Sequence, residues 1–170
     1  MVAAAQAGAT LLGMVFVPGV RRQINQETAQ GLVERFRLSF PDRPKIVGLF
    51  ADQPIEEVTD IAQFVGLDWI QLCGKEGPDF WSQIDRPLLQ SFHVPNPPVG
   101  GNTAVVDNVV VGPEALIRDY RSGTLAFLEG RLQALERSGG LAILDRGSEE
   151  QPGGVGQSFD WTVARNLADQ

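Results

Sequence analysis

Residues 45–72 read KIVGLFADQPIEEVTDIAQFVGLDWIQL, and this stretch decides the fold class. The run KIVGLF is almost wholly apolar, which is typical of a strand that is buried on both faces of a parallel sheet. Pro54 suits the first turn of a helix, and apolar residues then recur at helical spacing as far as Gly66. The run WIQL at 69–72 has the character of a second strand. The stretch therefore predicts a strand, a crossover helix and a second parallel strand.

The same alternation continues on both sides of this unit. Apolar runs predict three further strands, at Leu11–Val17, Leu88–Val94 and Leu141–Leu144. Helical patterns lie at Glu27–Phe40 with Asn25 as its cap, at Pro78–Ile84, at Pro113–Ser138 as one or two helices, and at Asp160–Ala168. The stretch Pro95–Val111 is either an extra strand or a surface insertion. The order predicts an α/β fold, for which a doubly wound sheet and a (β/α) barrel both fit.

Three of the five predicted strands contain almost only apolar residues, so we expect them to be buried on both faces.

Composition narrows the classes of function. The 170 residues include 14 Lys and Arg against 21 Asp and Glu, a net charge of −7, which argues against nucleic-acid binding. One Cys and one His exclude a disulfide framework and leave little for a metal site. The apolar run near the N-terminus has no basic stretch before it and is broken by Gly13, so neither a signal peptide nor a membrane span is expected. We expect a cytoplasmic protein with a single domain over residues 1–170.

Polar residues cluster just after the predicted strands, where parallel α/β folds carry their functional groups. They are PGVRR at 18–22, Asp52 and Gln53, QLCG at 71–74, His93, and DRG at 145–147. Asp145 ends an apolar run, where a partly desolvated carboxyl can hold a proton and donate it to a substrate. A helix cap or an ion pair with Arg146 is the alternative. Arg21 and Arg22 either bind a carboxylate or phosphate or form a solvated basic pair.

Three other features carry weaker signals. Cys73 is interpreted as a structural thiol, since no cation or helix start is assured beside it. His93 is interpreted as an ordinary residue at a strand end. The loop PGGVGQ at 152–157 either approaches an anion through its backbone amides or forms a turn. This loop lacks the lysine and the glycine spacing of nucleotide-binding loops, so nucleotide binding is not expected.

Five segments, taken in chain order, resemble the phosphoribosylanthranilate isomerase family. They are AAAQAGATLLGMVFVPGVRRQI at 3–24, VGLFADQPIEEV at 47–58, LDWIQLCG at 67–74, LAILD at 141–145 and GGVGQSFDW at 153–161. The family shows an alanine-rich helix before a strand that ends in an arginine loop, then VG[VL]F-x-N-Q, QLHG, LLD and GG-[ST]-G-x-x-[FL]-DW. Residues 95–140 match poorly. The resemblance implies a partial (β/α)8 TIM barrel of parallel strands with helical crossovers, lacking the first and last strands.

The resemblance also implies an activity. The family performs the Amadori rearrangement of N-(5-phosphoribosyl)anthranilate, a phosphorylated aminosugar, in tryptophan biosynthesis, and uses no cofactor and no metal. Carried over by motif, Asp145 is the general acid, and Arg22 contacts the anthranilate carboxylate with Arg21 beside it. Gln71, Gly154 and Gly156 are implied to bind substrate.

The sequence departs from the family in three places. The family's base cysteine lies in a strand upstream of the alanine-rich helix, and much of its phosphate grip lies in loops downstream of residue 170. QLCG stands where QLHG is usual. The resemblance implies an isomerase, these departures leave the activity of the isolated chain open, and the alternative is a non-catalytic barrel remnant that acts as a binding or interaction module. We expect the chain either to self-associate or to be fused to other enzymes of tryptophan biosynthesis.

Overall fold

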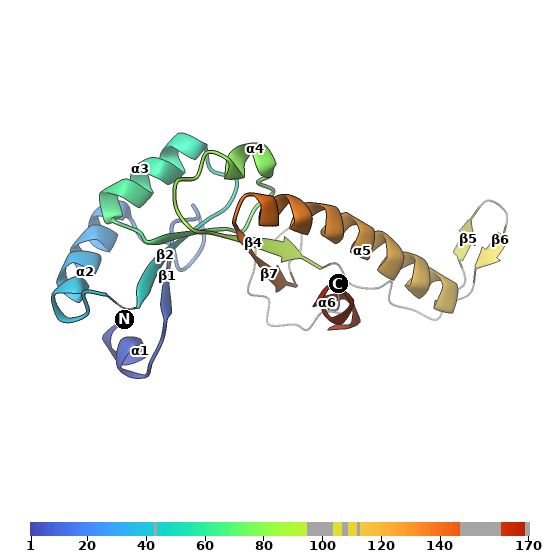
Figure 1. Ribbon diagram of the computed structural model, residues 1–170, viewed down its shortest axis with the longest axis horizontal. Coiled ribbons are helices and arrows are strands. Elements are labelled where there is room, and N and C mark those ends of the chain that lie inside the picture. The colour runs from blue at the N-terminus through green and yellow to red at the C-terminus, as the bar shows by residue number, and fades with distance from the viewer. Residues whose placement is uncertain (43, 95–103, 107–108, 112, 147–160, 169–170) are drawn as a thin grey trace. The chain divides into compact units, whose positions relative to one another are not determined.

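The computed structural model describes residues 1–42, 44–94, 104–106, 109–111, 113–146 and 161–168 (Figure 1). Five strands form one sheet in the order β1-β2-β3-β4-β7. Their bounds are Leu11–Val15 for β1, Lys45–Phe50 for β2, Trp69–Leu72 for β3, Leu88–His93 for β4 and Leu141–Asp145 for β7. The pairs β1–β2, β2–β3 and β3–β4 are parallel, so each of these strands ends at the same edge of the sheet.

Helices connect these parallel strands. The short α1 (Val2–Gln6) precedes β1, α2 (Gln26–Ser39) joins β1 to β2, and α3 (Ile55–Val65) joins β2 to β3. The helices α2 and α3 pack against each other, as Figure 1 shows. The strand–helix–strand unit predicted from residues 45–72 is therefore confirmed, and the described fold is α/β with helical crossovers.

The ends of these helices follow from the sequence. The Asn25 side chain accepts a hydrogen bond from the backbone N–H of Thr28 at 2.8 Å, which satisfies one of the free donors at the start of α2. Gly66 has a φ of 73° and donates its N–H to the carbonyl of Ala62, which ends α3 in the left-handed conformation that glycine adopts without strain. Both of these predicted helix ends are confirmed.

The core lies around β2 and β3. Every residue of β2 from Ile46 to Gly48 is buried, and Phe50 is fully buried, with its ring stacked on that of Phe16 at a centroid distance of 5.3 Å. Apolar side chains of α2 and α3 cover the sheet: Ala29, Val33, Phe36, Val58, Ala62 and Val65.

The prediction that the apolar strands are buried on both faces is wrong for two of them. Leu11 in β1 is 42% exposed and Leu141 in β7 is 55% exposed, and neither strand has more than one buried residue. These strands stand first and last in the sheet order, where a strand has a neighbour on one side only. An apolar sequence predicts a strand, but its position in the sheet decides how much of it is covered.

Three other elements differ from or refine the prediction. The helix expected at Pro78–Ile84 is shorter, since α4 spans Pro78–Trp81 and turns follow it. The long pattern after it forms one helix, α5 (Pro113–Arg137). Within Pro95–Val111, β5 (Ala104–Val106) and β6 (Val109–Val111) pair as antiparallel strands, while residues 95–103 and 107–108 lie outside the described part.

Trp81 in α4 anchors the connection between β3 and β4. Its ring is 2% exposed, and its Nε1 donates a hydrogen bond of 2.8 Å to Oε1 of Gln90, a fully buried residue of β4. The amide of Gln90 donates in turn to the carbonyls of Leu72 and Ser91, at 3.3 and 3.1 Å. These bonds satisfy a buried polar side chain inside an apolar layer.

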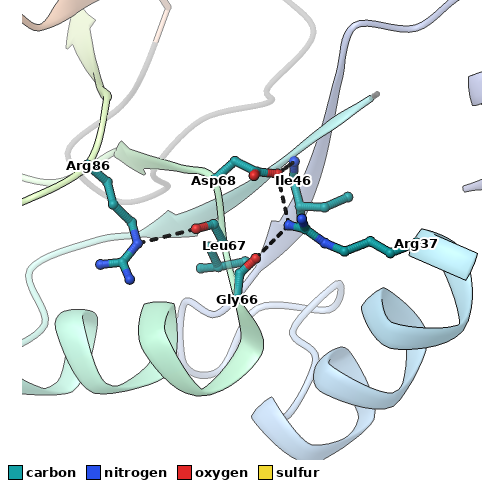
Figure 2. A network of polar contacts seen from close by, with 6 residues as sticks. All are labelled: Arg37, Ile46, Gly66, Leu67, Asp68 and Arg86. Carbon is teal, nitrogen blue, oxygen red and sulfur yellow. Dashed lines mark hydrogen bonds and ion pairs between the residues drawn. The ribbon is translucent and has the colours of Figure 1, made fainter. Parts of the chain in front are cut away.

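The strands begin at an edge that is held by a second polar network (Figure 2). Arg37, in the last turn of α2, donates from Nη2 to the Asp68 carboxylate at 3.0 Å and to the Gly66 carbonyl at 2.7 Å. The same carboxylate oxygen accepts the N–H of Ile46 at 2.7 Å, and Arg86 donates to the carbonyl of Leu67 at 3.2 Å. The start of β2, the end of α3 and the approach to β4 are thereby tied together.

The chain divides into two compact units. One comprises Met1–Ser91 with Leu135–Leu141, and the other comprises Phe92–Ala134 with Ala142–Gln170. In the second unit, Arg131 of α5 lies over the ring of Phe92 at 5.2 Å, and α6 (Trp161–Ala168) buries Val163 while Trp161 is 68% exposed. Among the described residues, no helix is both long enough and apolar enough to span a membrane.

Candidate active site

The carboxyl ends of the strands in the first unit carry three of the predicted site residues, Arg21, Arg22 and Gln71. The loop after β1 returns to its own strand: the Ile24 N–H donates to the Val15 carbonyl at 2.9 Å, and the Gly19 N–H donates to Oε1 of Gln23 at 2.9 Å. Gly19, at φ 76°, makes the turn that this return requires. The loop is thus fixed at both ends, and its tip carries Arg21 and Arg22.

Both arginines of this loop are exposed. Within the described part of the chain, neither Arg21 nor Arg22 forms an ion pair or a side-chain hydrogen bond. A guanidinium in this setting keeps all five donors for a carboxylate or phosphate. The structure therefore places the predicted anion-binding residues at the expected edge, and they are available to a ligand.

Gln71 belongs to a small polar cluster at the ends of β3 and β4. Its Nε2 lies 3.2 Å from the Ser91 hydroxyl and 3.5 Å from the Cys73 sulfur, and that sulfur lies 3.7 Å from the same hydroxyl. Ser91 is buried, while Gln71 and Cys73 are half-buried. Cys73 is thus part of a hydrogen-bonded group rather than an isolated core thiol. The cluster fixes the amide of Gln71, because its nitrogen is held by two neighbours.

A second group of polar contacts joins the loop after β2 to the loop after β3. The Asp52 N–H donates to Oε1 of Glu76 at 2.7 Å, and Oδ1 of Asp52 accepts the N–H of Lys75 at 2.7 Å. We call these two reciprocal bonds of Asp52, Lys75 and Glu76 the carboxylate clasp. Just before it, the Cys73 N–H donates to the Phe50 carbonyl at 2.8 Å. The two loops are therefore held together along their length.

Glu76 has a raised pKa. Only 6% of the residue is exposed, and this burial raises the pKa of its carboxyl, with the nearby Asp52 carboxylate acting in the same direction. Hydrogen bonds from backbone N–H groups, including that of Asp52, oppose the rise. A buried carboxylate is thus kept next to a second carboxylate at the edge where the strands end.

The remaining predicted residues lie in the second unit or outside the residues that the structure describes. Asp145 ends β7 and is half-buried, and its backbone carbonyl accepts the N–H of Val94 at 2.9 Å. The residue therefore lies at a strand end, as predicted. His93 is the last residue of β4 and is half-buried. Gly154 and Gly156 lie outside the described residues.

The N-terminal part of the chain matches one protein family. Residues 1–109 match the family model for N-(5'-phosphoribosyl)anthranilate (PRA) isomerase, which is more than half of the chain. The chain belongs to the phosphoribosylanthranilate isomerase family. The expected family and the expected α/β fold with barrel-type crossovers are thereby confirmed.

Individual relatives agree with this assignment. The N-(5'-phosphoribosyl)anthranilate isomerase of Dehalococcoides mccartyi is 33% identical over 166 residues, which cover 98% of this chain and 65% of that protein. A multifunctional tryptophan biosynthesis protein of Phycomyces blakesleeanus is 26% identical over 99% of this chain and 23% of its own length. The chain therefore spans less than two thirds of the first relative and under a quarter of the second.

The solved structures agree on the fold. The crystal structure of the isomerase from Thermotoga maritima superposes with a TM-score of 0.60 at 23% identity, covering 98% of this chain and 64% of that one. At this level of identity the likeness concerns the fold alone. It supports a strand-and-helix order that is shared with a member of the isomerase family.

Sequence reasoning missed two residues of this isomerase-family chain, Ser91 and Glu76. Ser91 lies within a predicted strand, and nothing in its local sequence distinguishes it from a residue of the core. Glu76 does carry a signal in the sequence. It follows the predicted strand at 69–72 as Asp52 follows the predicted strand at 45–50, and two adjacent parallel strands end at the same edge of a sheet. In the described ranges, no three His, Cys, Asp or Glu side chains gather in a way that would hold a metal ion.

Proposed function

We propose that this chain acts in the rearrangement of N-(5-phosphoribosyl)anthranilate to 1-(2-carboxyphenylamino)-1-deoxyribulose 5-phosphate, a step of tryptophan biosynthesis in the cytoplasm. The observation that carries the proposal is the match of residues 1–109 to the isomerase family, supported by the name of the relative from Dehalococcoides mccartyi. That relative is longer than this chain, so the full activity is part of the proposal.

Asp145 is proposed as the general acid. In an Amadori rearrangement, a proton is delivered to the ribose ring oxygen while the bond from that oxygen to C1 breaks, and a base then removes the proton from C2. A half-buried carboxyl at a strand end is suited to the first of these transfers, and Asp145 has this position. The second transfer is assigned to no residue of the described part.

Arg22 is proposed to bind the anthranilate carboxylate, with Arg21 beside it. The support is the fixed loop after β1, which holds both side chains at the carboxyl end of the strand with their donors available. Gln71, oriented by Ser91 and Cys73, is proposed to contact the sugar part of the substrate. Gly154 and Gly156 are proposed to contact the phosphate through backbone N–H groups, as at other anion-binding loops.

The test separates binding from turnover. Binding is measured by calorimetry with the reduced product analogue, reduced 1-(o-carboxyphenylamino)-1-deoxyribulose 5-phosphate, and turnover by the change in anthranilate fluorescence. Loss of a charge-assisted contact in Arg22→Gln is expected to weaken binding by roughly tenfold or more. Asp145→Asn should keep the affinity and lower any turnover by roughly 10²–10⁴-fold.

Arg35→Gln serves as the matched control, because Arg35 is an exposed arginine of α2. It should bind the analogue as the wild type does. A wild-type chain that neither binds the analogue at millimolar concentration nor converts the substrate would contradict the proposed function. Equal effects of Arg22→Gln and Arg35→Gln would contradict the role of Arg22.

Partnership is proposed on the same basis. The chain is expected to function as part of a larger assembly, either through self-association or through fusion to other enzymes of tryptophan biosynthesis. The multifunctional protein of Phycomyces blakesleeanus, in which a matching region makes up 23% of the length, supports the second form.

A further inference from the structure

The carboxylate clasp contains a residue with an unfavourable backbone conformation. Asp52 has a φ of 56° and is the one non-glycine residue with positive φ among the described residues. Left-handed backbone is unfavourable for a residue with a side chain, although Asp tolerates it better than most. Held strain of this kind accumulates where geometry matters for function.

Gly74 shows how closely the two loops approach each other. A Cβ at this position would lie 2.5 Å from Oδ1 and 2.7 Å from the backbone nitrogen of Asp52. Because one of these atoms belongs to the backbone, the contact cannot be relieved by turning a side chain. The clasp therefore depends on a residue without a side chain at this point.

Glu76 adds a second unfavourable feature. A carboxylate that is 6% exposed and lies beside another carboxylate is held against the electrostatic preference of both groups. A neutral side chain would join the loops with less opposition. The backbone of Asp52 and the buried carboxyl of Glu76 thus both oppose stability, and the close approach at Gly74 leaves no room for a side chain, yet together they fix one arrangement of the two loops.

The clasp fixes the part of segment 71–76 that follows β3. Gln71 itself lies within β3, and Cys73 links it to the clasp, because the Cys73 sulfur is 3.5 Å from Nε2 of Gln71. The near end of the part after β3 is held by the bond from Cys73 N–H to the Phe50 carbonyl, and its far end by the two bonds of the clasp. We propose that Asp52 and Glu76 are positioning residues, which order the strand-end segment 71–76 so that Gln71 meets the substrate in a single orientation. This inference rests on the proposed function, because it assigns a purpose to the Gln71 contact.

The chain contains one cysteine, so its labelling rate reports on this segment alone. Opening of segment 71–76 exposes the half-buried Cys73 thiol, and the rate of its reaction with a disulfide reagent measures how often this happens. The variants Asp52→Ala and Glu76→Ala remove one half of the clasp each. We expect each to raise the labelling rate by roughly tenfold and to weaken binding of the reduced product analogue by a similar factor.

Conservative variants distinguish positioning from general stability. Asp52→Asn keeps an acceptor oxygen and tolerates a positive φ, and Glu76→Gln keeps Oε1, so both should label and bind within about twofold of the wild type. Glu56→Ala is the matched control, since Glu56 is an exposed carboxylate in the first turn of α3. Should Glu76→Ala fail to fold, Asp52→Gly removes the carboxylate, relieves the backbone strain and leaves the Glu76 acceptor in place.

Two results would overturn the inference. One is labelling of Cys73 at the wild-type rate in the clasp-breaking variants; the other is faster labelling with unchanged affinity for the analogue. A wild-type chain that does not bind the analogue contradicts the proposed function instead. In that case the labelling rates still decide whether the clasp orders the segment.

Discussion

The two edges of the sheet are built in opposite ways. Where the strands begin, Asp68 lies between Arg37 and the N–H of Ile46, so a negative charge meets a positive charge and a donor (Figure 2). Where they end, Asp52 and Glu76 bring two carboxylates together, one of them buried and the other on left-handed backbone. In parallel α/β folds the first edge serves stability and the second carries function. The contrast teaches that strain and like charge are gathered at the edge where the proposed site lies.

Breaking the first edge should have the largest effect on stability. Asp68→Ala leaves the buried N–H of Ile46 without its acceptor. It also removes the ion pair with Arg37, a pair that is partly exposed to solvent. We expect the free energy of unfolding to fall by about 2 to 3 kcal/mol in urea denaturation, mostly from the buried donor. Asp60→Ala, an exposed residue of α3, should change it by less than about 0.5 kcal/mol.

This contrast fails if Asp68→Ala speeds the labelling of Cys73 by a larger factor than its loss of unfolding free energy accounts for. Such a result would show that the two edges are coupled rather than separate.

At the second edge, Gly74→Ala forces the two loops apart. The added Cβ meets the backbone of Asp52, and overpacking of this kind is expected to lower the free energy of unfolding by about 2 kcal/mol. Unlike Asp68→Ala, it should also speed the labelling of Cys73. Gly31→Ala, in open space on α2, is the control and should be neutral or slightly stabilising. Wild-type stability in Gly74→Ala would contradict the close approach.

The smallest effect concerns pH. Burial raises the pKa of Glu76 above its ordinary value of 4.5, so between the ordinary and the raised value the folded chain binds more protons than the unfolded chain. The contribution of Glu76 to stability therefore falls as pH rises through this window. Glu76→Gln should gain stability relative to the wild type from acidic to neutral pH, as measured by urea denaturation at several pH values. Glu56→Gln should show no such trend, and a pH-independent difference for Glu76→Gln would contradict the sign.

Local signals in the sequence were sufficient for most of the fold. The apolar run at 45–50, the cap at Asn25 and the helix end at Gly66 depend on neighbouring residues only, and each is found where it was predicted. The exposure of Leu11 and Leu141 was missed, because it depends on which strands stand last in the sheet. That order is a property of the whole fold and leaves no mark within either strand.

The candidate site was predicted in part for the same reason. Arg22, Gln71 and Asp145 follow or end strands, and the structure places each at such a strand end. Their roles in binding and proton transfer stay predictions. The clasp was missed because Asp52 and Glu76 are 24 residues apart, and their contact depends on the register between β2 and β3.

The hydrogen bond between Trp81 and Gln90 has a consequence for spectroscopy. Of the three tryptophans, Trp81 is almost completely shielded and Trp69 in β3 is half-buried, whereas Trp161 is 68% exposed, so their indole emissions differ in the folded chain. Loss of structure in the first unit shifts the emission of Trp69 and Trp81 to longer wavelength, while Trp161 contributes a nearly constant red background. Tryptophan fluorescence therefore follows the unit that contains the β1–β3 sheet, and melting of α6 passes almost unseen.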